Sequence, residues 1–147
     1  MKSTVVENRN AIFSSILYSK ALSWANITQS SIRICLGTHS GDHTIYPDCR
    51  PEFHEALDYA FKIGNWGSER VSNYLPYLEG NKYSILLDCQ KRSRELGLDF
   101  LFLLSNTNTC YQPDEQGICC GQCGSCIERL EAFQKLNIKD PVQYVTR

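Results

Sequence analysis

The stretch CYQPDEQGICCGQCGSC, residues 110–126, holds five of the eight cysteines in the chain. Cys120, Cys123 and Cys126 form two overlapping C-x-x-C steps, and Cys110 lies ten residues before Cys120. Four thiolates with this spacing can close a tetrahedral zinc site. The segment therefore predicts a zinc-binding knuckle with four ligands, Cys110, Cys120, Cys123 and Cys126.

A zinc ion with four thiolate ligands has no open coordination position, so we expect it to stabilise the fold rather than to activate water. Gly121 and Gly124 lie inside the knuckle, where tight turns favour residues that adopt positive φ. The residues alone leave alternatives open. Cys119 could replace Cys120 as a ligand, the same thiols could hold an iron–sulfur cluster, or they could be redox-active or buried free thiols.

Length and composition indicate a globular protein with one domain, residues 1–147. The chain is 42% hydrophobic and 21% charged, with a formal net charge of -1 and a pI near 6.3. This balance excludes disorder and provides no basic surface for direct binding to nucleic acid or to an anionic membrane. No apolar run reaches the roughly 18 residues of a membrane span, and residues 1–15 lack a signal-peptide pattern. We therefore expect a cytoplasmic protein whose thiols stay reduced, which favours metal binding over disulfides.

Hydrophobic periodicity predicts an alternation of strands and helices. Helices are expected over 10–24, 51–64, 81–96 and 127–136, and strands over 31–38, 71–78 and 98–104. The Asp140-Pro141 step is expected to end the last helix, and residues 105–140 should form a zinc-binding loop followed by that helix. The alternation predicts an α/β fold with a mainly parallel sheet, in which ligands bind beyond the carboxyl ends of the strands. The loops 38–48 and 105–111 would then face the active side.

Three strings, in chain order, carry a family resemblance. They are VENRN at residues 6–10, YPDCRPEF at residues 46–53, and CGQCGSCIERLEAF at residues 120–133 followed by Asp140-Pro141. Together they resemble the 7-cyano-7-deazaguanine synthase family over almost the whole chain. The match is to the C-terminal part of that family.

The resemblance implies an ATP-dependent C–N ligase with the PP-loop (adenine nucleotide α-hydrolase-like) fold. Its substrates would be 7-carboxy-7-deazaguanine, ammonia and ATP, with Mg²⁺ accompanying the ATP and zinc as a structural ion. The family activates the carboxylate by adenylation, forms the amide with ammonia, and then dehydrates the activated amide to the nitrile. The product, 7-cyano-7-deazaguanine, feeds queuosine or archaeosine biosynthesis.

The resemblance also assigns binding residues. The substrate would contact Tyr46, Asp48, Arg50 and Glu52, and ATP or phosphate would contact Arg9, Asn10 and Lys82. The chemistry agrees, since guanidinium groups bind carboxylate and phosphate in a bidentate manner and carboxylates accept hydrogen bonds from a guanine-like base. The alternative for each charged residue is a surface ion pair or a charge at a helix end.

The three histidines are not expected to be metal ligands or general bases. His54 lies in the first turn of a predicted amphipathic helix, where we expect a solvated side chain. His39 and His43 lie in the predicted active-side loop, where a ligand contact is the less favoured interpretation.

One motif of the PP-loop fold is missing from the sequence. The Ser-Gly-Gly-x-Asp-Ser loop that surrounds the ATP pyrophosphate does not occur, and Ser40-Gly41-Asp42 is only a superficial match. We therefore expect an incomplete parallel sheet with helices on both faces and one exposed edge. A second chain that supplies the PP-loop or a homodimer would cover this edge, unless the chain is a fragment.

Two other functions remain compatible with the sequence. One is a noncatalytic module that binds a deazapurine but has lost the ATP chemistry. The other is a related PP-loop enzyme that acts on another acid or on a protein terminus. The missing loop favours the first of these, whereas the YPDCRPEF string at residues 46–53 favours an enzyme.

Overall fold

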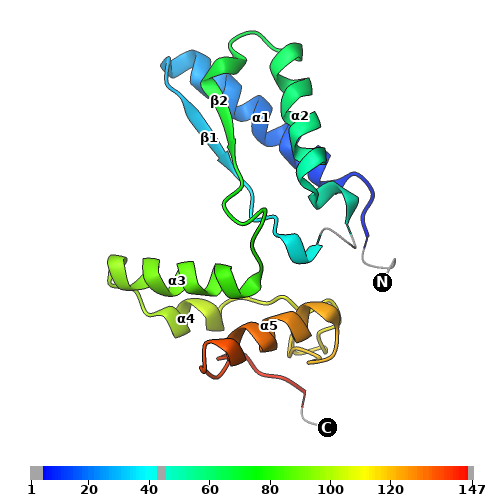
Figure 1. Ribbon diagram of the computed structural model, residues 1–147, viewed down its shortest axis with the longest axis vertical. Helices are drawn as coiled ribbons and strands as arrows, with labels where there is room; N and C mark the ends of the chain where they lie inside the picture. Colours follow the sequence, from blue (N-terminus) through cyan, green and yellow to red (C-terminus); the bar gives the residue numbers. More distant parts are fainter. Residues whose placement is uncertain (1–4, 43–45, 146–147) are drawn as a thin grey trace. The chain divides into compact units, whose positions relative to one another are not determined.

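The computed structural model describes residues 5–42 and 46–145. The chain divides into two compact units, Met1–Gly80 and Asn81–Arg147 (Figure 1). Whether the two units act as the single domain expected from the sequence stays a prediction. His43 lies outside the described residues. Among the described helices, none combines the length and the apolar character needed to cross a membrane.

The first unit is an α/β arrangement around a small parallel sheet. Its main elements are α1 (Arg9–Thr28), β1 (Ile32–Cys35), α2 (Pro51–Gly64) and β2 (Val71–Tyr74). Three short 3₁₀ turns, η2 (Ser40–Asp42), η3 (Pro47–Cys49) and η4 (Ser68–Arg70), connect them. The strands pair in parallel, from Ile32 opposite Val71 to Cys35 opposite Tyr74. The predicted parallel pairing and helices are thus confirmed, although both strands are shorter than expected and α1 continues beyond residue 24 to Thr28.

One face of the sheet packs against the helices. Tyr18 and Ala25 of α1 form a core with Ile34 and Val71 of the two strands. The ring of Phe61 on α2 stacks on that of Tyr18 with centroids 4.5 Å apart. These residues put α1 and α2 on the same face of the sheet.

The other face of the sheet is open. Its side chains come from the alternate positions Arg33, Cys35, Ser72 and Tyr74, all of which are exposed. The guanidinium of Arg33 lies 5.3 Å from the centroid of the Tyr74 ring on this face. Helices therefore cover one face of this sheet within the described residues, whereas the sequence predicted helices on both.

The second unit is mainly helical. It contains α3 (Lys82–Leu96), α4 (Phe100–Ser105) and α5 (Gly124–Lys135), packed through Leu86, Leu104, Ala132 and Phe133. Asn81 and Ser84 form a capping box at the start of α3, and Gly97 ends it at φ 67°. The predicted helices are confirmed here. Cys119 and Tyr144 form an isolated parallel bridge.

The strand predicted for residues 98–104 is wrong, because Phe100–Ser105 form α4. Asp99 caps this helix by accepting a hydrogen bond from the Phe102 N–H at 3.0 Å. A short apolar run has no periodicity that distinguishes a strand from a helix. Here the cap at Asp99 favours the helix. The end of α5 also differs from the prediction. The helix stops at Lys135, and Asn137 adopts φ 55°, before the Asp140-Pro141 step is reached.

Candidate metal centre and N-terminal polar cluster

Four cysteine sulfurs meet in the second unit. The Sγ atoms of Cys110, Cys120, Cys123 and Cys126 all lie within 4.8 Å of one another. A tetrahedral zinc site with Zn–S bonds of about 2.3 Å places its sulfurs about 3.8 Å apart. The cysteine quartet, as we call these four residues, therefore has the dimensions that such a site needs.

Backbone N–H groups donate hydrogen bonds to the sulfurs of the quartet, as at Cys110 and Cys120. Cys110 Sγ accepts hydrogen bonds from the N–H groups of Gln112 at 3.3 Å and Cys120 at 3.2 Å. Cys120 Sγ accepts from Gln122 at 3.4 Å and Cys123 at 3.3 Å. The bonds from Gln122 and Cys123 lower the pKa of Cys120 to about 6. The loop therefore stabilises a thiolate, the form in which cysteine binds metal.

For the two other thiols, Cys123 and Cys126, burial is the largest influence on the pKa. Burial acts to raise the pKa of Cys123, but N–H groups of Tyr111 and Cys126 outweigh it, and the pKa of this thiol is lowered. Cys126 is fully buried, and burial raises the pKa of its thiol. A buried thiolate is costly without a cation beside it. A metal ion among the four sulfurs would supply that cation.

The turns of the knuckle depend on glycine at two positions. Gly117 adopts φ 81° and Gly121 adopts φ 70°, in the left-handed region that favours glycine. A Cβ on Gly121 would also lie 3.4 Å from the Tyr144 ring. Gly124, by contrast, begins α5 and has no positive φ, so the turn role expected for it is wrong.

Cys119 is not one of the four grouped sulfurs, although its thiol contacts that of Cys126. Its side chain is 3% exposed and its Sγ lies 3.6 Å from Asn108 Oδ1. Its backbone bonds to the C-terminal segment, where its N–H donates to the Gln143 carbonyl and its own carbonyl accepts from the Val145 N–H. The structure thus groups Cys120, not Cys119, with the other three sulfurs.

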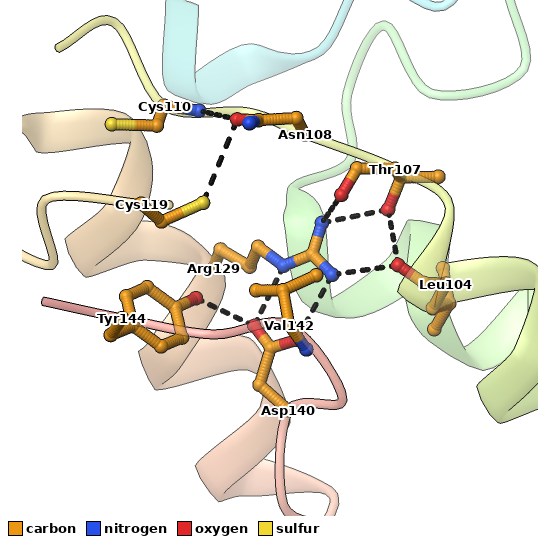
Figure 2. Close-up of polar contacts among 9 residues, drawn as sticks. All are labelled: Leu104, Thr107, Asn108, Cys110, Cys119, Arg129, Asp140, Val142 and Tyr144. Carbon is orange, nitrogen blue, oxygen red and sulfur yellow. Dashed lines mark hydrogen bonds and ion pairs between the residues drawn. The ribbon is translucent and has the colours of Figure 1, made fainter. Parts of the chain in front are cut away.

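A buried ion pair lies beside the knuckle (Figure 2). Arg129 of α5 binds Asp140 through two contacts, Nε to Oδ2 at 2.7 Å and a second guanidinium nitrogen to Oδ1 at 3.0 Å. The Tyr144 hydroxyl also donates to Asp140 Oδ2 at 2.7 Å. Burial and the bond to Asp140 raise the pKa of Tyr144, which keeps its hydroxyl protonated.

The remaining donors of Arg129 reach the last turn of α4 and the loop after it. They bind the Leu104 carbonyl at 3.1 Å and Thr107 Oγ1 at 2.8 Å. The guanidinium thus connects α5, this loop and the C-terminal segment at one point. Sequence reasoning missed this role. The signal was present, since Arg129 shares the helical spacing i, i+3, i+7 with Cys126 and Phe133, both buried.

A second polar cluster lies at the start of α1 in the first unit. Asp48 Oδ2 accepts the backbone N–H of Asn10 at 3.1 Å, and the Asn10 amide donates to the Asp48 carbonyl at 3.0 Å and to Cys49 Sγ at 3.3 Å. The Arg9 guanidinium lies 5.6 Å from the centroid of the buried Tyr46 ring. We call these residues, Arg9, Asn10, Tyr46, Asp48 and Cys49, the N-terminal cluster.

The N-terminal cluster contains four of the seven residues that the resemblance assigned to ligands. The Asp48 carboxylate lies against the first turn of α1, where a negative charge interacts favourably with the helix dipole. This contact matters because Asn8, the residue before the helix, makes no side-chain capping bond. Asp48 therefore has a structural task whether or not it also binds a ligand.

The other three residues assigned to ligands lie elsewhere. Arg50 immediately precedes α2 and is half-buried, and Glu52 is exposed in the first turn of that helix. Lys82 belongs to the second unit, where its ammonium pairs with Glu128 of α5. For Lys82, the ion pair that the sequence left as an alternative is therefore present.

His54 corrects one expectation. It is 5% exposed rather than solvated, and its ring lies edge-on to that of Phe53 at 5.5 Å. The amphipathic pattern predicted an exposed side chain because histidine is polar, although His54 lies one residue from the apolar stripe of the helix. His39 is also buried, and its Nδ1 accepts the Gly41 N–H at 3.1 Å.

Known proteins share this sequence pattern. The family profile of the queuosine biosynthesis protein QueC matches residues 1–137. The chain is 51% identical over 144 residues to 7-cyano-7-deazaguanine synthase 2 of Colwellia psychrerythraea, and 48% identical to synthase 1 of the same organism. It is 45% identical to the 7-cyano-7-deazaguanine synthase of Psychromonas ingrahamii. Each alignment covers 98% of the chain but 58% of the relative, so the chain spans little more than half of these proteins.

Proposed function

The chain belongs to the queuosine biosynthesis protein QueC family, and from that premise we propose that it is part of an ATP-dependent C–N ligase. This ligase converts 7-carboxy-7-deazaguanine and ammonia to 7-cyano-7-deazaguanine, with Mg²⁺ accompanying the ATP. The observation that carries the proposal is the family match over residues 1–137, supported by relatives named 7-cyano-7-deazaguanine synthase at 43–51% identity. Because the chain spans 58% of the first relatives, the reaction requires the remaining part of the fold, which would carry the PP-loop.

In this proposal the N-terminal cluster forms one wall of the ligand site. Tyr46, Asp48, Arg50 and Glu52 bind the deazapurine acid, and Arg9 and Asn10 bind ATP or its phosphates. The resemblance also gives Lys82 of the second unit a phosphate contact, in exchange for its ion pair with Glu128. The hydrogen bonds between Asn10 and Asp48 support it, because they hold two segments 38 residues apart in one fixed arrangement. Arg9 and Arg50 supply the cations that a carboxylate or phosphate ligand needs.

The cysteine quartet would hold a structural zinc ion. Four sulfurs within 4.8 Å and the N–H bonds to Cys110 and Cys120 support this assignment. A closed thiolate shell gives the ion no part in the chemistry, so zinc would contribute folding free energy to the second unit. Thiolate ligands also suit the reducing cytoplasm, which is the location that we propose.

One assay tests the ligase. The chain is incubated with 7-carboxy-7-deazaguanine, ammonia, ATP and Mg²⁺, alone and together with the part of the Colwellia psychrerythraea synthase 2 that it does not match. Mass spectrometry then detects the nitrile and any adenylated acid. We expect nitrile from the combination. If no preparation forms nitrile or adenylate while the acid still binds, the ligase is disproved and the noncatalytic deazapurine-binding module replaces it.

A pair of variants tests the substrate residues. Arg50→Gln should weaken binding of the acid by about 10- to 100-fold, which corresponds to the loss of one or more charge-assisted hydrogen bonds. Arg92→Gln is the matched control, since Arg92 lies on α3 with its side chain 60% exposed. Isothermal titration calorimetry of both variants measures the effect. Equal affinities for the two variants would remove Arg50 from the site.

A further inference from the structure

Helix α1 has two apolar faces. One face packs on the sheet through Tyr18 and Ala25, and it forms the core of the first unit. The other carries large apolar side chains whose exposed fractions run from 43% to 73%. This outer face of α1 consists of Ile12, Phe13, Ile16, Leu17, Trp24 and Ile27.

The two faces lie on opposite sides of the helix. Ile16 comes two residues before Tyr18, and Ile27 comes two residues after Ala25. At 3.6 residues per turn, a separation of two residues is a rotation of about 200°. A helix that is apolar on opposite sides is typical of the interior of a larger fold, where it lies between two layers. One of these layers is the sheet, which the described residues include (Figure 1).

The outer face has a single charge, Lys20, which lies between Ile16 and Trp24 at the helical spacing i, i+4, i+8. Arg9 is the only other charged residue of the helix. Monomeric proteins rarely leave a large group of apolar side chains on one helix face in contact with water. The composition of α1 therefore points to a second layer of protein on this face.

The sheet next to α1 also points to a further layer of protein. Among the described residues each strand has one partner, so β1 and β2 each leave one edge without ladder hydrogen bonds. Unpaired edges in a parallel sheet are normally covered by further strands or helices. The first unit thus has an uncovered helix face and two uncovered strand edges.

The relatives indicate what would cover this helix face and these strand edges. The chain aligns over 98% of its length with relatives of which it spans 58%, so these relatives contain a further part outside the aligned region. A second copy of the chain would repeat the same apolar helix and supply none of that part. We infer that the outer face of α1 is the surface on which the remaining part of the QueC family fold packs, through its own apolar side chains. This inference rests on family membership and extends the proposed function.

Co-purification tests the inference without substrates. The chain, with an affinity tag, is co-expressed with the unmatched part of the Colwellia psychrerythraea synthase 2, and native mass spectrometry determines the mass of the purified species. We expect a complex with one copy of each. The double variant Ile16→Lys/Trp24→Ser should reduce the yield of complex at least tenfold, because a lysine would be buried without a partner. Both substituted residues are exposed in the chain itself, so its circular dichroism spectrum should not change.

The matched control is Ile63→Lys/Trp66→Ser. Ile63 is 69% exposed and Trp66 is 98% exposed, and both lie outside α1. This control should bind the complementary part as the unmodified chain does. The inference is overturned if no complex forms, if both double variants bind equally, or if the outer face instead forms a homodimer of the chain. Since ATP and the acid are absent, failure of the ligase assay does not affect this result.

Discussion

Arg129 is a buried charge whose hydrogen-bonding groups are matched by partners. Its Nε and Nη2 donate to Asp140, Nη2 also donates to the Leu104 carbonyl, and Nη1 donates to Thr107. The side chains of Arg129 and Asp140 are 6% and 3% exposed. In such surroundings the loss of one partner leaves the other charge buried and unpaired, which costs more than the pair itself contributes.

Replacement of Arg129 by methionine should therefore destabilise the protein strongly. We expect Arg129→Met to lower the free energy of unfolding by about 3–5 kcal/mol. Urea denaturation measures the change. Arg92→Met is the control, because Arg92 forms only exposed ion pairs with Asp88 and Glu95, and it should change stability by less than about 1 kcal/mol. Similar losses in the two variants would contradict the structural role of Arg129.

The neighbouring cysteines Cys119 and Cys120 allow a sharp test of the metal site. Cys120→Ser and Cys123→Ser should lose zinc, since each removes one of the four grouped sulfurs. Cys119→Ser should keep one zinc per chain, because its sulfur lies near Asn108 outside the quartet. Inductively coupled plasma mass spectrometry of the purified variants gives the metal content. Zinc loss in Cys119→Ser with retention in Cys120→Ser would reverse the assignment.

At the scale of the element, α1 begins with help from a residue distant in sequence. Asn8 adopts φ 58° and makes no side-chain cap, whereas the Asp48 carboxylate accepts the N–H of Asn10. The α4 helix shows the local counterpart, since Asp99 caps it from the adjacent position. Local capping is readable from sequence, but capping from 38 residues away is not.

Substitutions at Asp48 should separate charge from hydrogen bonding. Asp48→Ala removes the acceptor at the start of α1 and should destabilise the protein by about 1 kcal/mol, as loss of an N-cap does. Asp48→Asn keeps an acceptor and loses only the interaction with the helix dipole, about 0.3–1 kcal/mol. Urea midpoints of the two variants give the comparison. A neutral effect of Asp48→Ala would mean that the carboxylate does not cap α1.

At the scale of the whole molecule, each compact unit has its own core. Tyr18, Ala25, Ile34 and Val71 belong to the first, and Leu86, Leu104, Ala132 and Phe133 to the second. All four sulfurs of the quartet lie in the second unit. The zinc ion proposed for them should therefore stabilise that unit and not the other.

Metal removal tests this division. After treatment with a chelator, amide hydrogen exchange should accelerate in α5 and in residues 110–126, because the ligand loop loses its cross-link. Exchange in α1 and α2 should stay unchanged, since their core contains no quartet residue. Hydrogen–deuterium exchange measured by mass spectrometry resolves the two regions. Equal acceleration in both units would show that the metal stabilises the molecule as a whole.

The sequence alone determined the features that depend on neighbouring residues. Spacing selected the quartet cysteines, and apolar periodicity with the signals at Pro51 and Gly97 placed α2 and α3. These features depend on geometry over a few residues, namely the repeat of a helical turn, the spacing of metal ligands and the capping of a helix end. The structure of the short run 98–104 could not be predicted in this way, since its pattern suits a strand as well as a helix.

Tertiary structure decided which polar side chains are buried and with whom. Arg129 meets Asp140 and Thr107, Asn10 meets Asp48, and His54 is buried on α2. A charged side chain is buried only where the folded chain brings it a matched partner. That partner comes from a segment distant in sequence, so the pairing depends on the fold and not on local pattern.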